Sequence, residues 1–203
     1  TQIVYYDYGE TPAIFEVRGL PMNSHYRDGN WAERSRISMD NCLGVSIGVV
    51  VHCKDGYTAN NKAYDHRGRL LKTFESTFEG DKENFINALW MNDPHHLYAD
   101  VEQGHLSAAL IHMGNASYRI GKKSNPGEIA ERIKGTACLQ ESFDRFATHL
   151  FANKIDWDQE DVILGPMLEF DRDREQFVGE HAAEANELIT RKYREPFVVP
   201  ETV

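Results

Sequence analysis

The sequence has few of the features that mark disulfide-rich, zinc-binding or membrane proteins. Its three cysteines, Cys42, Cys53 and Cys138, are odd in number and widely spaced, with no C-x-x-C, so we expect buried free thiols rather than a disulfide framework or a structural zinc site. No apolar run approaches the ~20 residues that a membrane-spanning helix needs. The amino terminus lacks the basic-then-apolar layout of a signal peptide. We therefore expect no membrane contact and a cytoplasmic location, although an export signal could precede Thr1.

The sequence is also short of positive charge. It has 22 Lys and Arg against 32 Asp and Glu, a net charge of -10, which repels nucleic-acid phosphates, so nucleic acid is not an expected partner. Hydrophobic residues make up 41% of the chain and aromatic residues 11%, as in ordinary globular proteins. The length suits one good-sized domain, and we predict a single domain over residues 1–203.

Several motifs that would define an active site are missing. Without G-x-G-x-x-G the chain lacks the turn that seats a dinucleotide pyrophosphate on a helix, and without G-x-S-x-G or H-E-x-x-H it supports neither a serine hydrolase nor a zinc protease. The segment from Gly121 to Ser124 faintly resembles a phosphate-binding G-K-S, but it lacks the preceding glycine and strand and is interpreted as a helix-ending turn. The acidic cluster 156–161 is interpreted as a solvated surface. No cofactor and no metal ion are expected on this chain by itself.

The first 78 residues have the pattern of β-strands. Two short runs within residues 2–8 and 13–18, separated by the turn residues 9–12, predict a hairpin. Alternation over residues 45–53 predicts a further strand, with strands near 57–64 and 69–78 joined by turns at Asp55-Gly56 and at residues 65–68.

After Gly80 the apolar period lengthens to about 3.6 residues. It predicts a helix capped by Asp81, a longer one from about Asp100 to Ile120 that stops at Gly121, a short one opened by the capping box 125–128, and helices over 141–153 and 182–192. Residues 162–170 are predicted to be extended. Strands followed by helices indicate an α+β domain, an open, mainly antiparallel β-sheet with helices packed on one face.

The predicted helix 100–120 carries the best candidates for ligand contact. Its apolar stripe (Leu106, Ala109, Leu110, Met113, Ser117, Ile120) borders a second face that holds His105, Ala109, His112 and Ala116. The two histidines are about 10.5 Å apart along the axis, at ~1.5 Å per residue, too far to share one metal ion. His105, His112 and nearby Asn115 are either hydrogen-bonded packing residues or substrate-binding residues.

Arg18 is a further candidate for substrate binding. It alternates with Glu16 onto the same side of an early strand, where unpaired charges would be costly in a core. We therefore expect the two residues to face solvent, a partner subunit or a polar ligand.

Six segments together resemble one protein family, the Gfo/Idh/MocA oxidoreductases (glucose-fructose oxidoreductase and inositol dehydrogenase-like enzymes), in the bacterial-type carboxy-terminal domain. They occur in the family's order, span essentially the whole chain, and are residues 5–9, 15–21, 104–107, 112–121, 164–170 and 193–200.

The resemblance implies a parent NAD(P)-dependent oxidoreductase acting on a sugar, inositol or related polyol. In that family an amino-terminal Rossmann domain binds NAD or NADP, and the carboxy-terminal domain contributes to the substrate site and commonly to the subunit interface. The chain starts at Thr1 without a methionine, already in a strand-like run, so we expect an excised carboxy-terminal domain without its Rossmann domain. The resemblance also implies a homodimer or homotetramer formed through the sheet.

The family's usual catalytic groups are absent from this sequence. There is no Glu-Lys-Pro, and none of the nine histidines has Asp or Glu four positions earlier, so we expect the chain alone to be inactive. Two alternatives remain: a non-catalytic sugar-binding or oligomerisation module of a degenerate relative, and an NAD-assisted glycoside hydrolase.

Overall fold

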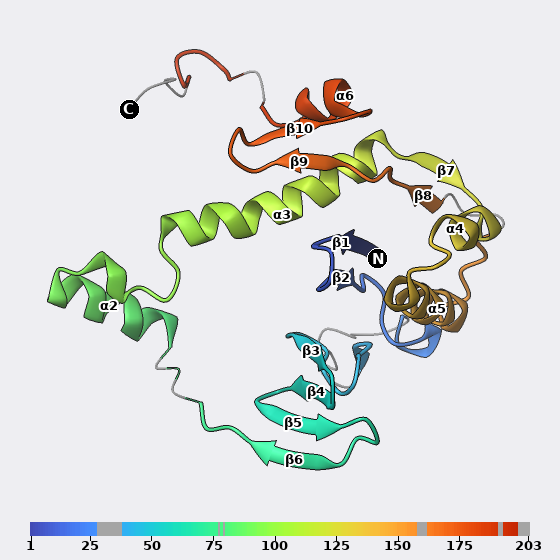
Figure 1. The fold of residues 1–203 in the computed structure, drawn as a ribbon, viewed down its shortest axis with the longest axis horizontal. Coiled ribbons are helices and arrows are strands. Elements are labelled where there is room, and N and C mark those ends of the chain that lie inside the picture. The colour runs from blue at the N-terminus through green and yellow to red at the C-terminus, as the bar shows by residue number, and fades with distance from the viewer. Residues whose placement is uncertain (28–37, 77, 79, 158–161, 191–192, 199–203) are drawn as a thin grey trace. The chain divides into compact units, whose positions relative to one another are not determined.

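The chain folds into helices and small antiparallel sheets, which is compatible with the predicted α+β class (Figure 1). The open sheet with helices on one face stays a prediction. The computed structural model describes residues 1–27, 38–76, 78, 80–157, 162–190 and 193–198. They form two compact units, one of residues 1–98 and 133–160 and the other of residues 99–132 and 161–203. The single domain over residues 1–203 stays a prediction. Among the described residues, no helix is long and apolar enough to span a bilayer.

Small antiparallel sheets and short to medium helices make up both units. The first unit contains β1 (Gln2–Tyr6), β2 (Ala13–Val17), η1 (Ser24–Tyr26), β3 (Val50–Cys53), β4 (Gly56–Ala59), β5 (Lys62–Asp65), β6 (Leu70–Thr73), α2 (Asp81–Met91), η2 (Pro94–His96) and α5 (Ala137–Ala152). The second contains α3 (Val101–Ile120), β7 (Lys122–Ser124), α4 (Pro126–Arg132), β8 (Val162–Leu164), β9 (Glu169–Asp171), β10 (Gln176–Val178) and α6 (Ala182–Asn186).

The amino-terminal hairpin forms where the sequence predicts it. β1 and β2 pair antiparallel from Gln2 opposite Val17 to Tyr6 opposite Ala13. In the turn, Gly9 has a φ of +74°, a conformation that glycine adopts without steric cost, and its N–H donates to Asp7 Oδ1 at 2.9 Å. α5 packs against both strands, so the hairpin gains a helical cover.

The four-stranded sheet, in the order β3-β4-β5-β6, corrects two predictions. The strand expected over 45–53 pairs only from Val50 to Cys53. The strand expected over 57–64 is wrong, because Asn60 and Asn61 turn the chain back between β4 and β5, with φ of +49° and +58°. Two asparagines at positive φ suit a type I′ hairpin turn. The predicted turn at 65–68 is confirmed by the bond from Gly68 N to Asp65 O.

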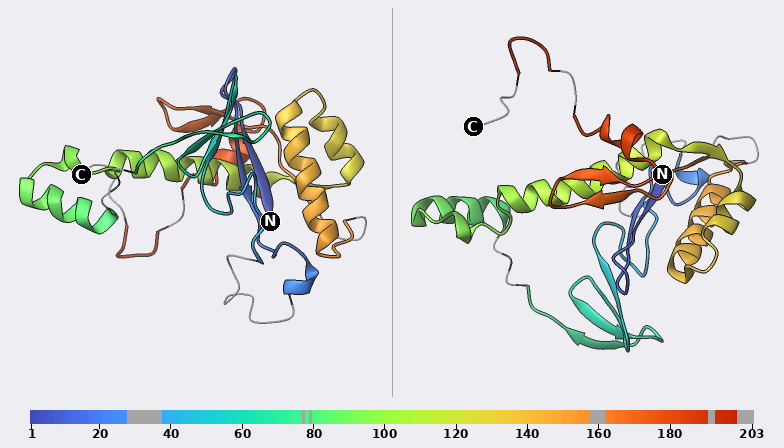
Figure 2. Two further views of the ribbon diagram at one scale, coloured as in Figure 1. Left: turned by 90° about the horizontal axis from the view of Figure 1, so that it is seen from below. Right: turned by 45° about the horizontal axis from the view of Figure 1, so that its top comes forward.

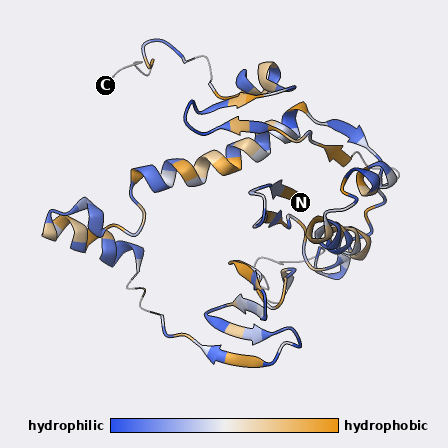
Figure 3. Cartoon of the chain, in the orientation of Figure 1, coloured by the Kyte–Doolittle hydropathy of each residue, from blue (hydrophilic) through white to orange (hydrophobic). Residues whose placement is uncertain are grey.

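The N-cap of α2 lies one residue earlier than predicted, so the helix begins at Asp81 itself. Gly80 occupies the N-cap and Asp81 the first turn, while Asn92 ends the helix in the left-handed conformation. The buried Asn84 joins α2 to η2: its Nδ2 donates to His96 O and its Oδ1 accepts from Tyr98 N, both at 2.9 Å. The large apolar residues of the helix are exposed, Trp90 most of all at 85%, whereas Ala88 is buried. Figure 3 shows hydrophobic and hydrophilic residues mixed along this helix.

The core of the second unit lies between the end of α3, the β9–β10 hairpin and α6 (Figure 2). Ala116, Phe177 and Ala185 are its buried residues. Ala116 was expected on the histidine face of the helix, but it packs into this core because the hairpin and α6 cover that end of α3. The side chain of Asn186 fixes β10 by accepting from Phe177 N and donating to Phe177 O.

α3 ends at Gly121 as predicted, for a different physical reason. Gly121 has an ordinary φ of -66°, but a Cβ there would lie 2.7 Å from Ile163 Cγ2, so glycine permits the close approach of β8. Gly165 is tighter still, because its Cβ would lie 2.2 Å from Ser117 Oγ. The capping box that opens α4 is confirmed: Glu128 N donates to Asn125 Oδ1, and Asn125 N donates to Glu128 Oε2.

Candidate functional site

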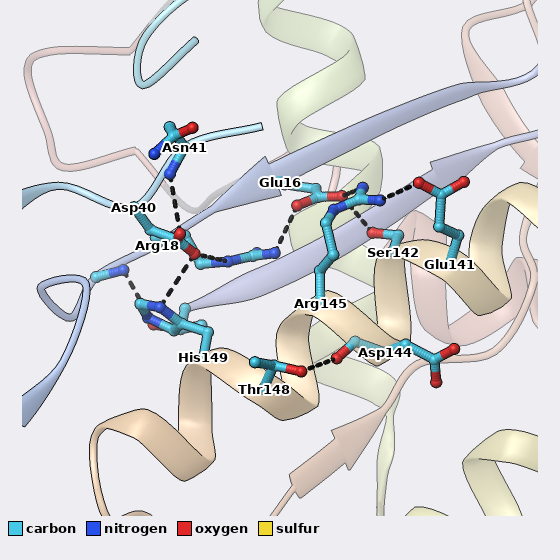
Figure 4. A network of polar contacts seen from close by, with 12 residues as sticks. Glu16, Arg18, Asp40, Asn41, Glu141, Ser142, Asp144, Arg145, Thr148 and His149 are labelled. Atoms are coloured by element: carbon cyan, nitrogen blue, oxygen red, sulfur yellow. Dashed lines mark hydrogen bonds and ion pairs between the residues drawn. The ribbon is translucent and has the colours of Figure 1, made fainter. Parts of the chain in front are cut away.

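The first unit contains a cluster of charged side chains between β2 and α5 (Figure 4). Its centre is Glu16, whose Oε1 accepts from Ser142 Oγ and from Arg145 Nη2, each at 2.5 Å. Its Oε2 accepts from Arg18 Nη2 at 2.5 Å. Arg145 Nη1 also donates to Glu141 Oε1 at 2.8 Å. A single carboxylate therefore gathers two guanidinium groups and a hydroxyl from the hairpin and the helix.

Arg18 extends this cluster toward α5 and the segment before Asn41. Its side chain is 12% exposed, and its Nε lies 3.3 Å from Asp40 Oδ2. The same carboxylate oxygen lies 3.1 Å from Nδ1 of His149, whose side chain is 1% exposed. Arg18 also lies over the ring of Phe146, with 5.7 Å from its Cζ to the ring centroid. From the sequence alone, Glu16 and Arg18 were expected to face solvent, a ligand or a partner subunit. In the structure they pair with each other and with neighbouring charged residues.

The surroundings shift the pKa values of several members of the cluster, Glu16 and His149 among them. Burial alone would raise the pKa of Glu16, but the hydrogen bond from Ser142 and the positive charges of Arg18 and Arg145 together lower it below its usual 4.5. Burial lowers the pKa of His149 below its usual 6.5, and Arg18 acts in the same direction, against the raising effect of Asp40. At neutral pH Glu16 is therefore ionised and His149 neutral.

Two further groups fasten the end of α5 to the chain after β2. The buried Asn153 donates from Nδ2 to Pro21 O at 2.8 Å, and Arg27 Nη1 donates to Asn153 O at 2.9 Å. Within the part of the chain that the structure describes, both ring nitrogens of His149 lack a hydrogen-bond partner of good geometry, despite the nearby Asp40. Because its members mainly contact one another, the cluster has a structural role: it joins the β1–β2 hairpin to α5.

The second unit carries the histidine face that the sequence predicts on α3. His105 Nε2 lies 2.7 Å from Glu175 Oε1, and the two side chains are 56% and 58% exposed. Glu175 lies just before β10 in a left-handed backbone conformation, with a φ of +52°. His112 and Asn115 are exposed on the same helix. Among the described residues, His105 is the candidate of this face with a recorded side-chain partner.

The candidate residues belong to two different units. His105, His112 and Asn115 belong to the second unit, whereas Arg18 belongs to the first. Sequence reasoning missed five partners of these residues: Asp40, Ser142, Arg145, His149 and Glu175. The sequence did offer one signal, because three polar residues of α5 follow one another at a spacing of four: Glu141, Arg145 and His149. Residues at this spacing lie on the same face of a helix. No local pattern indicates Asp40 or Glu175.

The positions of the cysteines correct the prediction of buried thiols. All three are free, but Cys42 is half-buried and Cys53 and Cys138 are exposed, so they are not the buried thiols expected. Among the described residues, no group of three or more His, Cys, Asp or Glu side chains could hold a metal ion.

Searches for similar proteins give no further guide to these sites. No protein-family model, curated protein or solved structure matches the chain. Its residues and their geometry are therefore the basis for a proposal.

Proposed function

We propose that this chain is the carboxy-terminal domain of an NAD- or NADP-dependent oxidoreductase that acts on a sugar, inositol or related polyol. It contributes part of the substrate-pocket wall and the subunit interface, and another domain of the parent protein binds the cofactor. In the assembled enzyme the small antiparallel sheets belong to an open sheet with helices on one face, the arrangement typical of the Gfo/Idh/MocA family.

One observation carries the proposal: two of the segments that resemble the family pack closely against each other and are joined by a hydrogen bond. Ser117, in the segment 112–121, donates from Oγ to Pro166 O at 2.8 Å, and Pro166 belongs to the segment 164–170. Gly165 allows this approach, because any Cβ there would overlap Ser117. A serine and a glycine far apart in the sequence thus pack together, as we expect if both segments belong to one family domain.

The exposed apolar residues support a role in a larger assembly. In α2 and the sheet β3–β6, large hydrophobic side chains that would normally be buried face outward: Val51, Leu70, Leu71, Phe85, Ile86, Leu89, Trp90 and Met91. Exposed large apolar side chains in this number are a common feature of surfaces that contact a partner. We expect the chain to self-associate at tens of micromolar, and a clean monomer in sedimentation would contradict this expectation.

The experiment compares the product of the complete reading frame with the 203-residue chain. Each is mixed with NAD⁺ or NADP⁺ and a panel of hexoses, inositols and their acids, and reduction of the cofactor is followed by absorbance. We expect the complete product to reduce one cofactor and the chain to reduce neither. Calorimetry should detect no cofactor binding to the chain, because it lacks the glycine-rich turn.

Other outcomes would point to the two alternatives. A complete product without a glycine-rich turn or cofactor reduction, but with polyol binding, would identify a sugar-binding or oligomerisation module. Hydrolysis of a glycoside that requires NAD⁺ without its net reduction would identify a hydrolase. Saturable cofactor binding by the chain alone at micromolar concentration would refute the proposal that another domain binds the cofactor.

A further inference from the structure

We infer that Glu175 is a positioning residue, which holds the imidazole of His105 in one tautomer so that its second nitrogen accepts a hydrogen bond from a hydroxyl group of a polyol ligand. The contact between His105 Nε2 and Glu175 Oε1, at 2.7 Å across 70 residues of sequence, motivates the inference. The class of ligand rests on the proposed function. The positioning itself rests on the geometry of the second unit.

The chemistry of the pair fixes where the proton lies. An ionised carboxylate can only accept hydrogen bonds, so the imidazole nitrogen facing it, Nε2, must carry the proton. In the neutral ring the other nitrogen, Nδ1, then has a free lone pair and is an acceptor. Carboxylates orient histidines in this way at many metal and catalytic sites. Glu175 therefore makes His105 an acceptor for a hydroxyl group.

Glu175 is the last residue of the loop 172–175 that joins β9 to β10, a position where hairpin loops commonly adopt a left-handed conformation. A φ of +52° is a left-handed conformation, which costs free energy for a residue with a long side chain and suits glycine or asparagine better. A hydrogen bond between two side chains that are each more than half exposed returns little stability. The contact of Glu175 with His105, rather than its backbone conformation, is therefore the observation that carries the inference.

The surroundings of His105 leave room for a ligand. A Cβ built on the preceding residue, Gly104, would meet nothing within 4 Å. His112 lies seven residues further along, nearly two turns, so it leaves α3 on the same side as His105 and is exposed. Alanines 108 and 109 between them have short side chains. An accessible acceptor with a second polar group two turns away suits a molecule with several hydroxyl groups.

The test follows the ring nitrogens of His105 in the 203-residue chain by long-range ¹H–¹⁵N NMR. At a pH where the ring is neutral, we expect the Nε2–H tautomer to predominate in the wild type. Glu175→Gln should lose this preference, because its amide can donate as well as accept. The matched control Glu187→Gln removes an exposed carboxylate of the same unit and should change nothing.

A second variant separates positioning from folding. Glu175→Gly removes the side chain but suits the left-handed backbone, so it should keep the melting temperature of the wild type while losing the tautomer preference. The probe for the ligand is myo-inositol, with D-glucose in parallel, added up to the solubility limit. Either should shift the Nδ1 signal of the wild type and of Glu187→Gln, and the shift should be lost in both Glu175 variants.

Each result decides the inference. An Nδ1–H tautomer in the wild type, an unchanged tautomer in Glu175→Gln, or no shift of Nδ1 with either polyol would overturn it. The proposed function fails separately, if the complete product reduces neither cofactor. A polyol-dependent shift in a chain whose complete product has no oxidoreductase activity would leave the inference standing and reject the proposed enzyme.

Discussion

Replacing Glu16 by Gln should destabilise the first unit strongly. Glutamine keeps the size of the side chain but removes the charge that Ser142, Arg145 and Arg18 share. Removing one partner of a buried ion pair typically costs about 3–5 kcal/mol, because the other charge stays buried. Arg18 is nearly buried here, but Arg145 is 34% exposed and is screened by water. We therefore expect a loss of about 2–4 kcal/mol at pH 7.

Tryptophan fluorescence can report on this part of the fold. The ring centroid of Trp157 lies 5.5 Å from that of Phe143 and 6.0 Å from that of Phe146, both on α5. With Trp31 and Trp90 replaced by Phe, its emission during urea unfolding follows α5 alone. Glu10→Gln, at an exposed position in the turn of the same hairpin, is the matched control, and its effect should stay within about 0.5 kcal/mol.

Two further measurements make the prediction specific to the ion pair. In a double-mutant cycle with Arg145→Met, the loss in the double variant should be smaller than the sum of the single losses. The folded pKa of Glu16 lies below its usual 4.5, so its contribution is fully present above that pH and is lost as the pH falls further. Equal stability of Glu16→Gln and Glu10→Gln at pH 7, or a difference that persists in acid, would refute the reasoning.

The remaining predictions concern His149 and two glycines. His149 has a folded pKa below its usual 6.5, so the unfolded chain binds a proton at this residue first as the pH falls. The free energy of unfolding should therefore decrease as the pH drops from 6.5 toward the folded pKa. In His149→Gln the free energy of unfolding should depend less steeply on pH over that window, and an unchanged slope would contradict the assignment. Gly165→Ala should cost about 2–4 kcal/mol in urea unfolding, because its Cβ would overlap Ser117 and break the bond to Pro166. Gly104→Ala, with open space around its Cβ in the exposed part of α3, should instead stabilise by about 0.5–1 kcal/mol, and similar losses in both variants would count against the close packing at Gly165.

Local chemistry along the chain determined the elements that the sequence predicted correctly. The first hairpin, the helix 101–120 between Asp100 and Gly121, and the capping box 125–128 each depend on residues within a few positions of one another. Alternation, helical period and caps record such short-range interactions directly. The same local logic failed at Asn60-Asn61, where a turn signal was available but the alternating pattern on both sides suggested one strand.

Tertiary structure alone decided how the charged residues are used. Arg18 and Glu16 could be recognised as unusual on a strand, but Asp40, Arg145 and His149, which surround them, lie 22 to 133 residues away along the chain. His105 was recognisable on its helix face, and Glu175 was not, because only the β9–β10 hairpin brings it within 2.7 Å. A sequence pattern reports periodicity and propensity. The pairing of charged side chains depends instead on contacts between distant segments, which form only when the chain folds.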